Sequence, residues 1–253
     1  MLKETVLAES IARISGKILV DNLGKINSRK EKSPKNFVTN VDLASEKLII
    51  SEIKKKYPTH QILSEEAGEK KTNSQYKWII DPLDGTHNYM HSFPLFGVSI
   101  AVEHKGEVVS AVINVPLLNR MYVAEKGKGS YLNGKRIHVS KTNSLYHSLI
   151  VMDSLFDRYF ERLTELLEKI SPLVNAIRFP GAAIMDLSSV AVGEADAYIC
   201  IHTNPWDVAA GMLLIKEAGG KITDYSGKPV DHYARNFIAT NSLLHNAVLK
   251  TLK

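Results

Sequence analysis

Apolar residues recur at helical spacing near the start of the chain. They follow one another at intervals of four, three and four residues, which is one face of an amphipathic helix. These residues are Leu7, Ile11, Ile14 and Ile18. We therefore expect a helix over roughly the first twenty residues, with Gly24 as its C-cap. A second helix should begin near Asp42, whose side chain can cap free amides, and end before Pro58.

The middle of the chain changes to short β-rich runs separated by turn signals. The runs are Trp78–Ile80, Phe96–Val102, Val108–Val115, Met121–Ala124 and Ser130–Leu132. His104-Lys105-Gly106 and Asn133-Gly134 are typical of hairpin turns, because Gly and Asn tolerate positive φ. The pattern predicts antiparallel strands packed on the two opening helices.

Helical and strand patterns alternate in the second half. Helices are predicted over Asp157–Ile170, Ala182–Val192, Asp207–Ala218 and from Ser242, and strands over Ala197–Ile201, Lys221–Thr223 and Phe237–Ala239. Such alternation predicts a sheet covered by helices on both faces, so the fold class is mixed α/β (α+β). Polar residues at Lys141–Tyr146 mark the expected boundary between an α+β half, 1–143, and an α/β half, 144–253.

Length and composition exclude several classes of protein. The chain has 253 residues, of which 44% are hydrophobic and 23% charged, enough for a sizeable core and unlike a disordered or fibrous chain. No run approaches the ~18 apolar residues of a membrane span, and Glu4 interrupts any signal peptide. We expect a cytoplasmic protein. The single cysteine, Cys200, fits a reducing compartment and lies in an apolar run typical of a core.

The chain is basic, with a net charge of +5. This favours anionic partners but does not choose among nucleic acid, membrane surface and phosphorylated metabolite. The densest basic run, Lys25–Lys35, has one aromatic neighbour, Phe37. A nucleic-acid strip usually interleaves aromatic residues, so this run is interpreted as a solvated loop.

Three acidic clusters lie at predicted element ends, where side chains can converge on a cleft. They are Glu65-Glu66, the segment Asp81-Pro82-Leu83-Asp84-Gly85-Thr86, and Asp207 at the start of a helix. If a strand ends at Pro82 and Gly85 lets the chain turn, both aspartates and the Leu83 carbonyl can face one point. Hard divalent cations prefer such oxygen ligands, and the following backbone N–H groups suit a phosphate. The alternative is an N-cap aspartate beside an ordinary turn aspartate.

Other catalytic signatures are missing from the sequence. There is no Walker A loop, no glycine-rich dinucleotide motif, no serine nucleophile elbow and no HExxH pair. A histidine-ligated zinc site is therefore unsupported. An oxygen-only site for Mg²⁺ remains.

Five segments together resemble the motifs of the inositol monophosphatase family. They are Asn36–Asp42, Ser64-Glu65-Glu66, Asp81–Thr86, Gly181-Ala182-Ala183 and Trp206–Gly211, and their order and spacing hold from Lys32 to Gly211. The resemblance implies a layered αβαβα sandwich of the sugar-phosphatase type, usually a homodimer. It also implies Mg²⁺-dependent, lithium-sensitive hydrolysis of small phosphate monoesters.

The resemblance assigns roles to individual residues. Metal ligands would be Glu65, Asp81, the Leu83 carbonyl, Asp84 and Asp207, holding about two or three Mg²⁺ ions, with Mn²⁺ as a possible substitute. The catalytic residues would be Glu65, Thr86 and Asp42, with Glu65 and Thr86 positioning the attacking water. Substrate would be bound by Asp84, Gly85, Thr86, Gly181, Ala183 and Asp207. Lys32, or Lys30 in its place, would belong to the metal-site loop.

Three positions depart from the family pattern: His87, Pro180 and Cys200. Cys200 stands where inositol-preferring members often carry a glutamate that binds ring hydroxyls. We therefore expect a permissive enzyme that cleaves inositol 1-phosphate and, comparably, other phosphorylated polyols or sugars. Fructose-1,6-bisphosphatase or broad sugar and nucleotide phosphatase activity is the alternative.

Two other classes compete with this interpretation. A phosphatase of the haloacid-dehalogenase type has its two aspartates separated by one residue, whereas Asp81 and Asp84 are separated by two. A basic nucleic-acid-binding protein is supported by net charge alone and stays open, because binding and catalysis could coexist.

Overall fold

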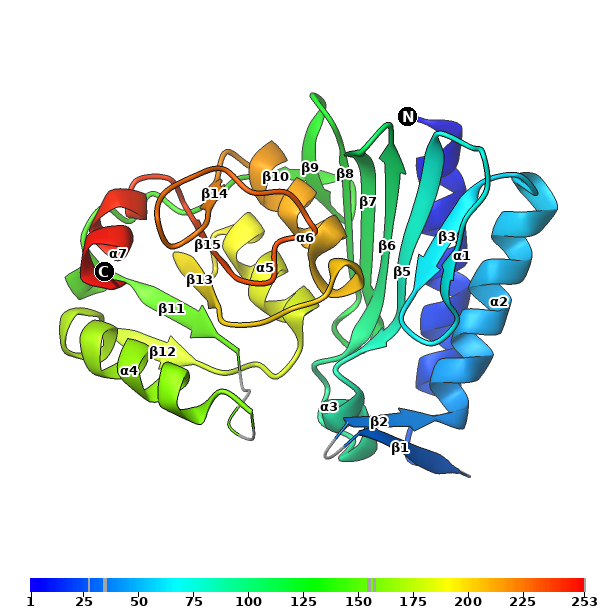
Figure 1. The fold of residues 1–253 in the computed structure, drawn as a ribbon, viewed down its shortest axis with the longest axis horizontal. Helices are drawn as coiled ribbons and strands as arrows, with labels where there is room; N and C mark the ends of the chain where they lie inside the picture. The colour runs from blue at the N-terminus through cyan, green and yellow to red at the C-terminus, as the bar shows by residue number, and fades with distance from the viewer. Residues whose placement is uncertain (27, 34–35, 154–155, 157, 253) are drawn as a thin grey trace.

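The chain folds into five layers of alternating helices and sheets (Figure 1). The computed structural model describes residues 1–253 except 27, 34–35, 154–155, 157 and 253. Its α-helices are α1 (Lys3–Asp21), α2 (Asn40–Lys56), α3 (Thr86–Met90), α4 (Phe160–Ile170), α5 (Ala183–Val192), α6 (Pro205–Glu217) and α7 (His245–Leu252). The layered α/β fold class expected from the sequence is confirmed.

The larger sheet has eight strands. Their spatial order is β10 (Lys135–Ile137), β9 (Gly129–Leu132), β8 (Arg120–Glu125), β7 (Glu107–Val115), β6 (Gly97–His104), β5 (Tyr76–Asp84), β3 (Gln61–Ser64) and β4 (Gly68–Lys70). Neighbours are antiparallel except β3 and β5. Side chains alternate along each strand, so Ile80 packs under α1 and α2 while Ile79 joins the core with α5 and α6.

The smaller sheet has five strands and is covered on both faces. Their order is β12 (Ala176–Arg178), β11 (Leu149–Met152), β13 (Ala197–Cys200), β15 (Phe237–Thr240) and β14 (Lys221–Thr223). Helices α4 and α7 pack on one face, and α5 and α6 on the other.

Helices α5 and α6 form the middle layer and contact both sheets. Every residue of α6 from Val208 to Ile215 is buried, and a Cβ at Gly211 would come within 2.5 Å of Leu187. Close packing therefore requires glycine there. Residues from both predicted halves share this core, and the division at 143/144 stays a prediction.

The interpretation of the lysine-rich run as a loop was wrong for Arg29–Ser33, which form a strand, whereas Lys25, Ile26 and Ser28 lie outside helices and strands. Arg29–Ser33 (β1) and Asn36–Thr39 (β2) form an antiparallel hairpin in which Lys30 is opposite Val38. Lys35 lies outside the described residues. Charged side chains do not prevent pairing of an exposed two-stranded ribbon, because backbone bonds hold it together.

Several element boundaries differ from the predicted ones. Helix α1 ends at Asp21 with Asn22 as C-cap, so Gly24, at φ +73°, lies in the turn that follows. Its buried stripe includes Ile11 and Leu19, while Ile14 is 48% exposed. The starts of several helices also differ. Helix α2 begins at Asn40, α4 at Phe160 and α7 at His245, and Asp157 lies outside the described residues.

No helix in the described part of the chain is long and apolar enough to cross a membrane.

Candidate active site

The segment Asp81–Thr86 is shaped by strand β5 and a left-handed glycine. β5 does not end at Pro82, as predicted, but continues to Asp84, with an irregular register against β6 between the two aspartates. The Asp81 carboxylate accepts a hydrogen bond from the Leu83 N–H at 3.0 Å. Gly85 has φ +83°, and a Cβ there would lie 2.7 Å from the Leu95 carbonyl oxygen. The turn that brings both aspartates to one side thus requires glycine.

A pocket of about 170 Å³ lies at this turn. Its lining comprises Phe37, Glu65, Asp81, Leu83, Asp84, Gly85, Thr86, His87, Gly181 and Asp207. All five positions expected to ligate metal are present in that set, although they come from β5, the segment after β3 and helix α6. The pocket joins segments up to 170 residues apart, from Phe37 to Asp207.

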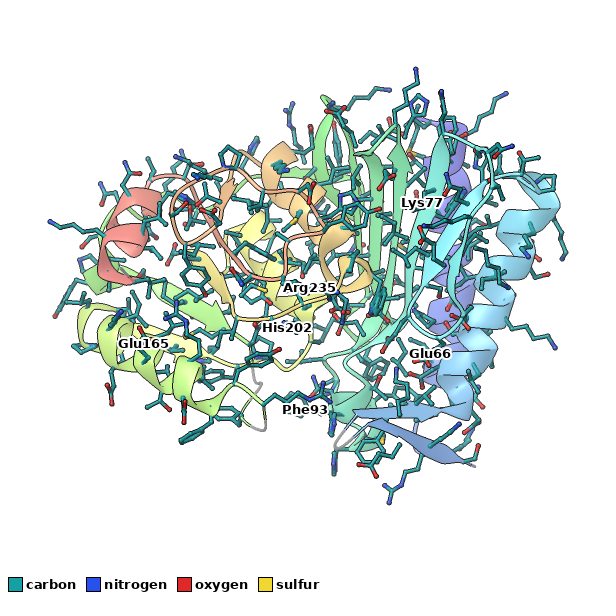
Figure 2. The ribbon with its side chains drawn as sticks, viewed as in Figure 1. Glu66, Lys77, Phe93, Glu165, His202 and Arg235 are labelled. Atoms are coloured by element: carbon teal, nitrogen blue, oxygen red, sulfur yellow. The ribbon has the colours of Figure 1, made fainter. Side chains whose placement is uncertain are left out.

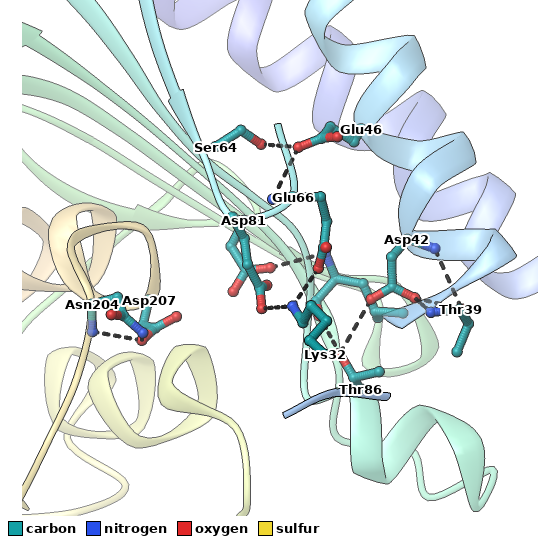
Figure 3. A network of polar contacts seen from close by, with 12 residues as sticks. Lys32, Thr39, Asp42, Glu46, Ser64, Glu66, Asp81, Thr86, Asn204 and Asp207 are labelled. Atoms are coloured by element: carbon teal, nitrogen blue, oxygen red, sulfur yellow. Dashed lines mark hydrogen bonds and ion pairs between the residues drawn. The ribbon is translucent and has the colours of Figure 1, made fainter. Parts of the chain in front are cut away.

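Lys32 reaches into the acidic cluster from β1 (Figure 3). Its Nζ lies 2.6 Å from Glu65 Oε1 and 2.6 Å from Glu66 Oε1. Lys30, the alternative considered for this position, is exposed. The turn that carries both glutamates is itself held by buried Glu46 of α2, which accepts bonds from the Ser64 hydroxyl and from the Ala67 N–H at 2.8 Å. Sequence reasoning missed Glu46, although a charged residue in the apolar stripe of a helix is a usable signal.

Asp42 occupies the third position of α2 and takes part in its N-terminal cap. Thr39 is the N-cap, and its N–H donates to Asp42 Oδ2 at 2.9 Å, completing a capping box. The other oxygen, Oδ1, accepts from the Thr86 hydroxyl at 3.3 Å; that hydroxyl also lies 3.1 Å from the Leu83 carbonyl. The hydrogen bond expected between Asp42 and Thr86 is therefore present.

Asp207 occupies the same third position in α6. Its Oδ2 accepts from the Asn204 N–H at 2.8 Å and from the Thr203 hydroxyl at 3.2 Å. Across the pocket, Asp84 Oδ2 accepts from the Ile184 N–H at 2.6 Å in the first turn of α5. The N-terminal ends of three long helices thus surround the acidic cluster and bring partial positive charge to it.

Burial raises the pKa of every carboxylate in the cluster, and mutual repulsion adds to the effect. The pKa of Asp84 is raised to about 8 by burial and by Asp207. Burial raises the pKa of Asp207 to about 6 despite its hydrogen bonds. Burial also raises the pKa of Asp81 strongly, followed by repulsion from Glu65. For Glu65, burial outweighs the Lys32 charge, so that its pKa is raised as well.

This donor set fits a hard divalent cation chemically. Four carboxylates and a carbonyl offer oxygen alone, which Mg²⁺ prefers, and a cation would relieve their repulsion. In the part of the chain that the structure describes, no three acidic, histidine or cysteine side chains already form a coordination sphere. Lys32 instead supplies positive charge at one side. The carboxylate side chains would have to move closer together to coordinate an incoming ion.

The loop before α5, which was predicted to face substrate, forms one wall of the pocket. Gly181 has φ +76° and lines the pocket, whereas Ala183 begins α5. Asn88 of α3 fixes this loop, because its Nδ2 lies 2.9 Å from the Pro180 carbonyl oxygen and 2.7 Å from that of Leu95. Asn88 was not predicted from the sequence, since nothing local marks a residue whose partner lies 92 positions away.

His87 and Cys200 have different surroundings. His87 lines the pocket and makes an edge-to-face contact with Phe37, with the ring centroids 5.6 Å apart. Cys200 is fully buried in the middle core, as expected, and burial raises the pKa of its thiol well above the ordinary value. A thiolate nucleophile at this position is therefore disfavoured.

Comparisons with known proteins agree on one family. The profile of the inositol monophosphatase family matches residues 2–253. A "Fructose-1,6-bisphosphatase/inositol-1-monophosphatase" of Thermotoga maritima is 35% identical, over 96% of this chain and 93% of that protein. A "Nus factor SuhB" of Pseudomonas aeruginosa is 37% identical, over 98% of this chain and 94% of that protein.

A solved structure gives the same result. The extragenic suppressor protein suhB of Bartonella henselae superposes with a TM-score of 0.94 at 33% identity, covering 98% of this chain and 97% of that one. Profile, sequence and fold agree over almost the whole length. The chain therefore belongs to the inositol monophosphatase family.

Proposed function

We propose that this protein hydrolyses small phosphate monoesters with Mg²⁺. The observation that carries the proposal is the gathering of Glu65, Asp81, Asp84 and Asp207 around one small pocket beside the Gly85 turn. Membership of a family named for a phosphatase supports it. The expected compartment is the cytoplasm.

Each residue has a definite task in the proposed reaction. Glu65, Asp81, the Leu83 carbonyl, Asp84 and Asp207 would hold Mg²⁺. When bound, the metal supplies charge to stabilise the phosphoryl group and the departing oxygen and to acidify a water. Without such a cation, the carboxylates would repel a phosphate dianion.

The chain's own groups would orient the reactants. The Thr86 hydroxyl donates to Asp42, so its oxygen can accept a hydrogen bond from the attacking water and orient it. Glu65 would take one proton from that water as the general base. The Gly85 and Thr86 N–H groups would bind phosphate, and Gly181 and Ala183 would shape the wall that faces the alcohol.

We further propose a permissive substrate range among phosphorylated polyols and sugars, with inositol 1-phosphate foremost. Cys200 is a poor hydrogen-bond acceptor and lies buried, so it cannot select ring hydroxyls as a glutamate would. The double name of the Thermotoga maritima relative is consistent with such breadth.

The test is phosphate release from inositol 1-phosphate, glycerol 2-phosphate, fructose 1,6-bisphosphate and adenosine 3′,5′-bisphosphate, with and without Mg²⁺. We expect Mg²⁺-dependent turnover, substitution by Mn²⁺ and inhibition by Li⁺. Asp81→Asn should lower kcat by at least about 10²-fold, because it removes a charged ligand. Full activity of folded Asp81→Asn would contradict the metal assignment. A preference above about 10³-fold for inositol 1-phosphate would contradict the permissive range.

A second candidate function is that of a Nus factor. The name of the Pseudomonas aeruginosa relative favours it, and the +5 net charge is compatible with an RNA partner. RNA retention by the inactive Asp81→Asn variant that weakens as salt rises would support this role. Absence of retention at low salt would argue against direct RNA binding.

A further inference from the structure

The orientation of Asp207 depends on the short segment 201–204 that joins β13 to α6. Three donors from this segment converge on a single oxygen, Asp207 Oδ2: the Asn204 N–H, the Asn204 side-chain amide at 3.3 Å and the Thr203 hydroxyl. A carboxylate held through one oxygen leaves the other directed elsewhere, here toward the pocket that Asp207 lines. Whatever fixes this segment therefore fixes Asp207.

Arg235 holds the segment from a distant part of the chain (Figure 2). Its Nη1 donates to the Thr203 carbonyl at 3.0 Å and to Asn204 Oδ1 at 2.6 Å, while its own carbonyl accepts from the Thr203 N–H at 2.9 Å. The bond to Oδ1 determines how the Asn204 amide is turned. With the amide oxygen on the guanidinium, the NH₂ group faces Asp207; the reverse orientation would bring two acceptors together.

Asp153 fixes the opposite side of the same segment. This buried carboxylate follows β11 and accepts bonds from the backbone N–H groups of Ile201 and His202, the latter at 3.1 Å, and from the Tyr198 hydroxyl. Residues 201–204 are thus bonded from two neighbouring loops. Arg235 bonds to Thr203 and Asn204, the two residues that donate to Asp207, whereas Asp153 bonds to the backbone of Ile201 and His202.

We propose that Arg235 is a positioning residue for the metal site, acting through Asn204 on Asp207. The proposal rests on the proposed function, in which Asp207 is a metal ligand. Arg235 itself is not among the residues that line the pocket. Outer groups that orient a metal ligand commonly change metal affinity by ~10–100-fold when removed.

Whether loss of the Arg235 side chain weakens or tightens Mg²⁺ binding distinguishes a positioning role from simple charge repulsion. A positive side chain near a cation site repels the cation, so loss of that charge alone should tighten Mg²⁺ binding. Loss of the Asn204 orientation should weaken it instead. A role confined to overall stability should lower the melting temperature and leave Mg²⁺ affinity unchanged.

The experiment measures Mg²⁺ binding to substrate-free protein by calorimetry, together with kcat and KM. Arg235→Met should weaken Mg²⁺ binding about tenfold, at the lower end of outer-group effects, with KM for substrate little changed at saturating Mg²⁺. Arg235→Lys, which keeps a donor for Asn204 Oδ1, should restore most of the affinity. Lys228→Met is the matched control, because it removes an equal charge from the same loop, where Lys228 bonds Asp224 through its backbone.

A double-mutant cycle tests the route through Asn204. In an Asn204→Ala background, Arg235→Met should have little further effect on Mg²⁺ affinity. Unchanged or tighter binding in Arg235→Met, or additive effects in the double variant, would overturn the inference while wild-type turnover with Mg²⁺ left the proposed function intact. If wild type shows neither Mg²⁺ binding nor turnover, the proposed function fails, and the inference fails with it.

Discussion

The Thr86 hydroxyl lies between a carboxylate and a carbonyl, 3.3 Å from Asp42 Oδ1 and 3.1 Å from the Leu83 oxygen. In the proposed reaction it orients water but does not hold metal. Thr86→Ala should therefore lower kcat by about 10²-fold, as expected for loss of an orienting group, and change the Mg²⁺ activation constant little. Steady-state kinetics over a Mg²⁺ series measure both. Wild-type kcat in this variant would remove Thr86 from the mechanism. Thr164→Ala in α4, far from the pocket lining, is the control.

Asp84 gives a pH dependence that needs no substrate. Its pKa rises to about 8 in the folded chain from an ordinary value of 3.8, mainly through burial. The folded state therefore binds this proton more tightly than the unfolded state. The resulting stability is complete below about pH 4 and is lost as pH rises toward 8.

Thermal melts of the metal-free protein between pH 5 and pH 8.5 test this. The melting temperature of Asp84→Asn should decline less over that range than that of wild type, because a neutral amide keeps the Ile184 bond and cannot ionise. Each kcal/mol of repulsion that the substitution removes should raise the melting temperature by about 2–4 °C. Asp21→Asn, at the exposed C-terminal end of α1, is the control. Parallel curves for Asp84→Asn and wild type would contradict the raised pKa.

At the scale of elements, caps and turns convert local sequence into site geometry. Asp42 and Asp207 each occupy the third position of a helix. Each accepts a hydrogen bond from the backbone N–H of the N-cap residue of its helix, Thr39 or Asn204. The same bonds that satisfy the free N–H groups of the helix ends also hold two carboxylates at the pocket.

Gly85 offers a test of the turn between β5 and α3. Gly85→Ala adds the cost of a left-handed alanine, about 1–2 kcal/mol, and a Cβ 2.7 Å from the Leu95 carbonyl oxygen. The free energy of unfolding, from urea denaturation, should fall by about 3 kcal/mol or more. Gly134→Ala, at φ +77° with no atom within 4 Å of the new Cβ, should show the conformational cost alone. Equal losses in the two variants would show that Leu95 moves aside freely.

At the scale of the whole molecule, we expect a homodimer, as the family resemblance implies. Apolar rings remain on the surface of the single chain: Phe156 and Phe179 are 50% and 36% exposed, with centroids 5.5 Å apart. Exposed aromatic pairs of this kind are common at interfaces. Light scattering should give twice the 28.1 kDa chain mass at micromolar concentration. A mass equal to one chain throughout would contradict the dimer.

The sequence by itself determined those features in which the interacting residues are close together. Apolar spacing predicted the helices, Asn133-Gly134 predicted a hairpin turn with both residues at positive φ, and Asp81–Thr86 marked the acidic turn. These features depend on backbone preference and on neighbours along the chain. The motif order then pointed to the family, which the comparisons show.

Tertiary structure alone decided the features whose partners are far apart in sequence. Ile14 is exposed although it fits the helical spacing, because the buried face of α1 includes Ser15 and Gly16 instead, with Gly16 against Asn114. Glu46, Asn88 and Arg235 bond to residues 18, 92 and 31 positions away. No local pattern encodes such pairs, because they form only when the layers pack. The sequence thus determined which groups carry the proposed chemistry, while packing decided how they are held.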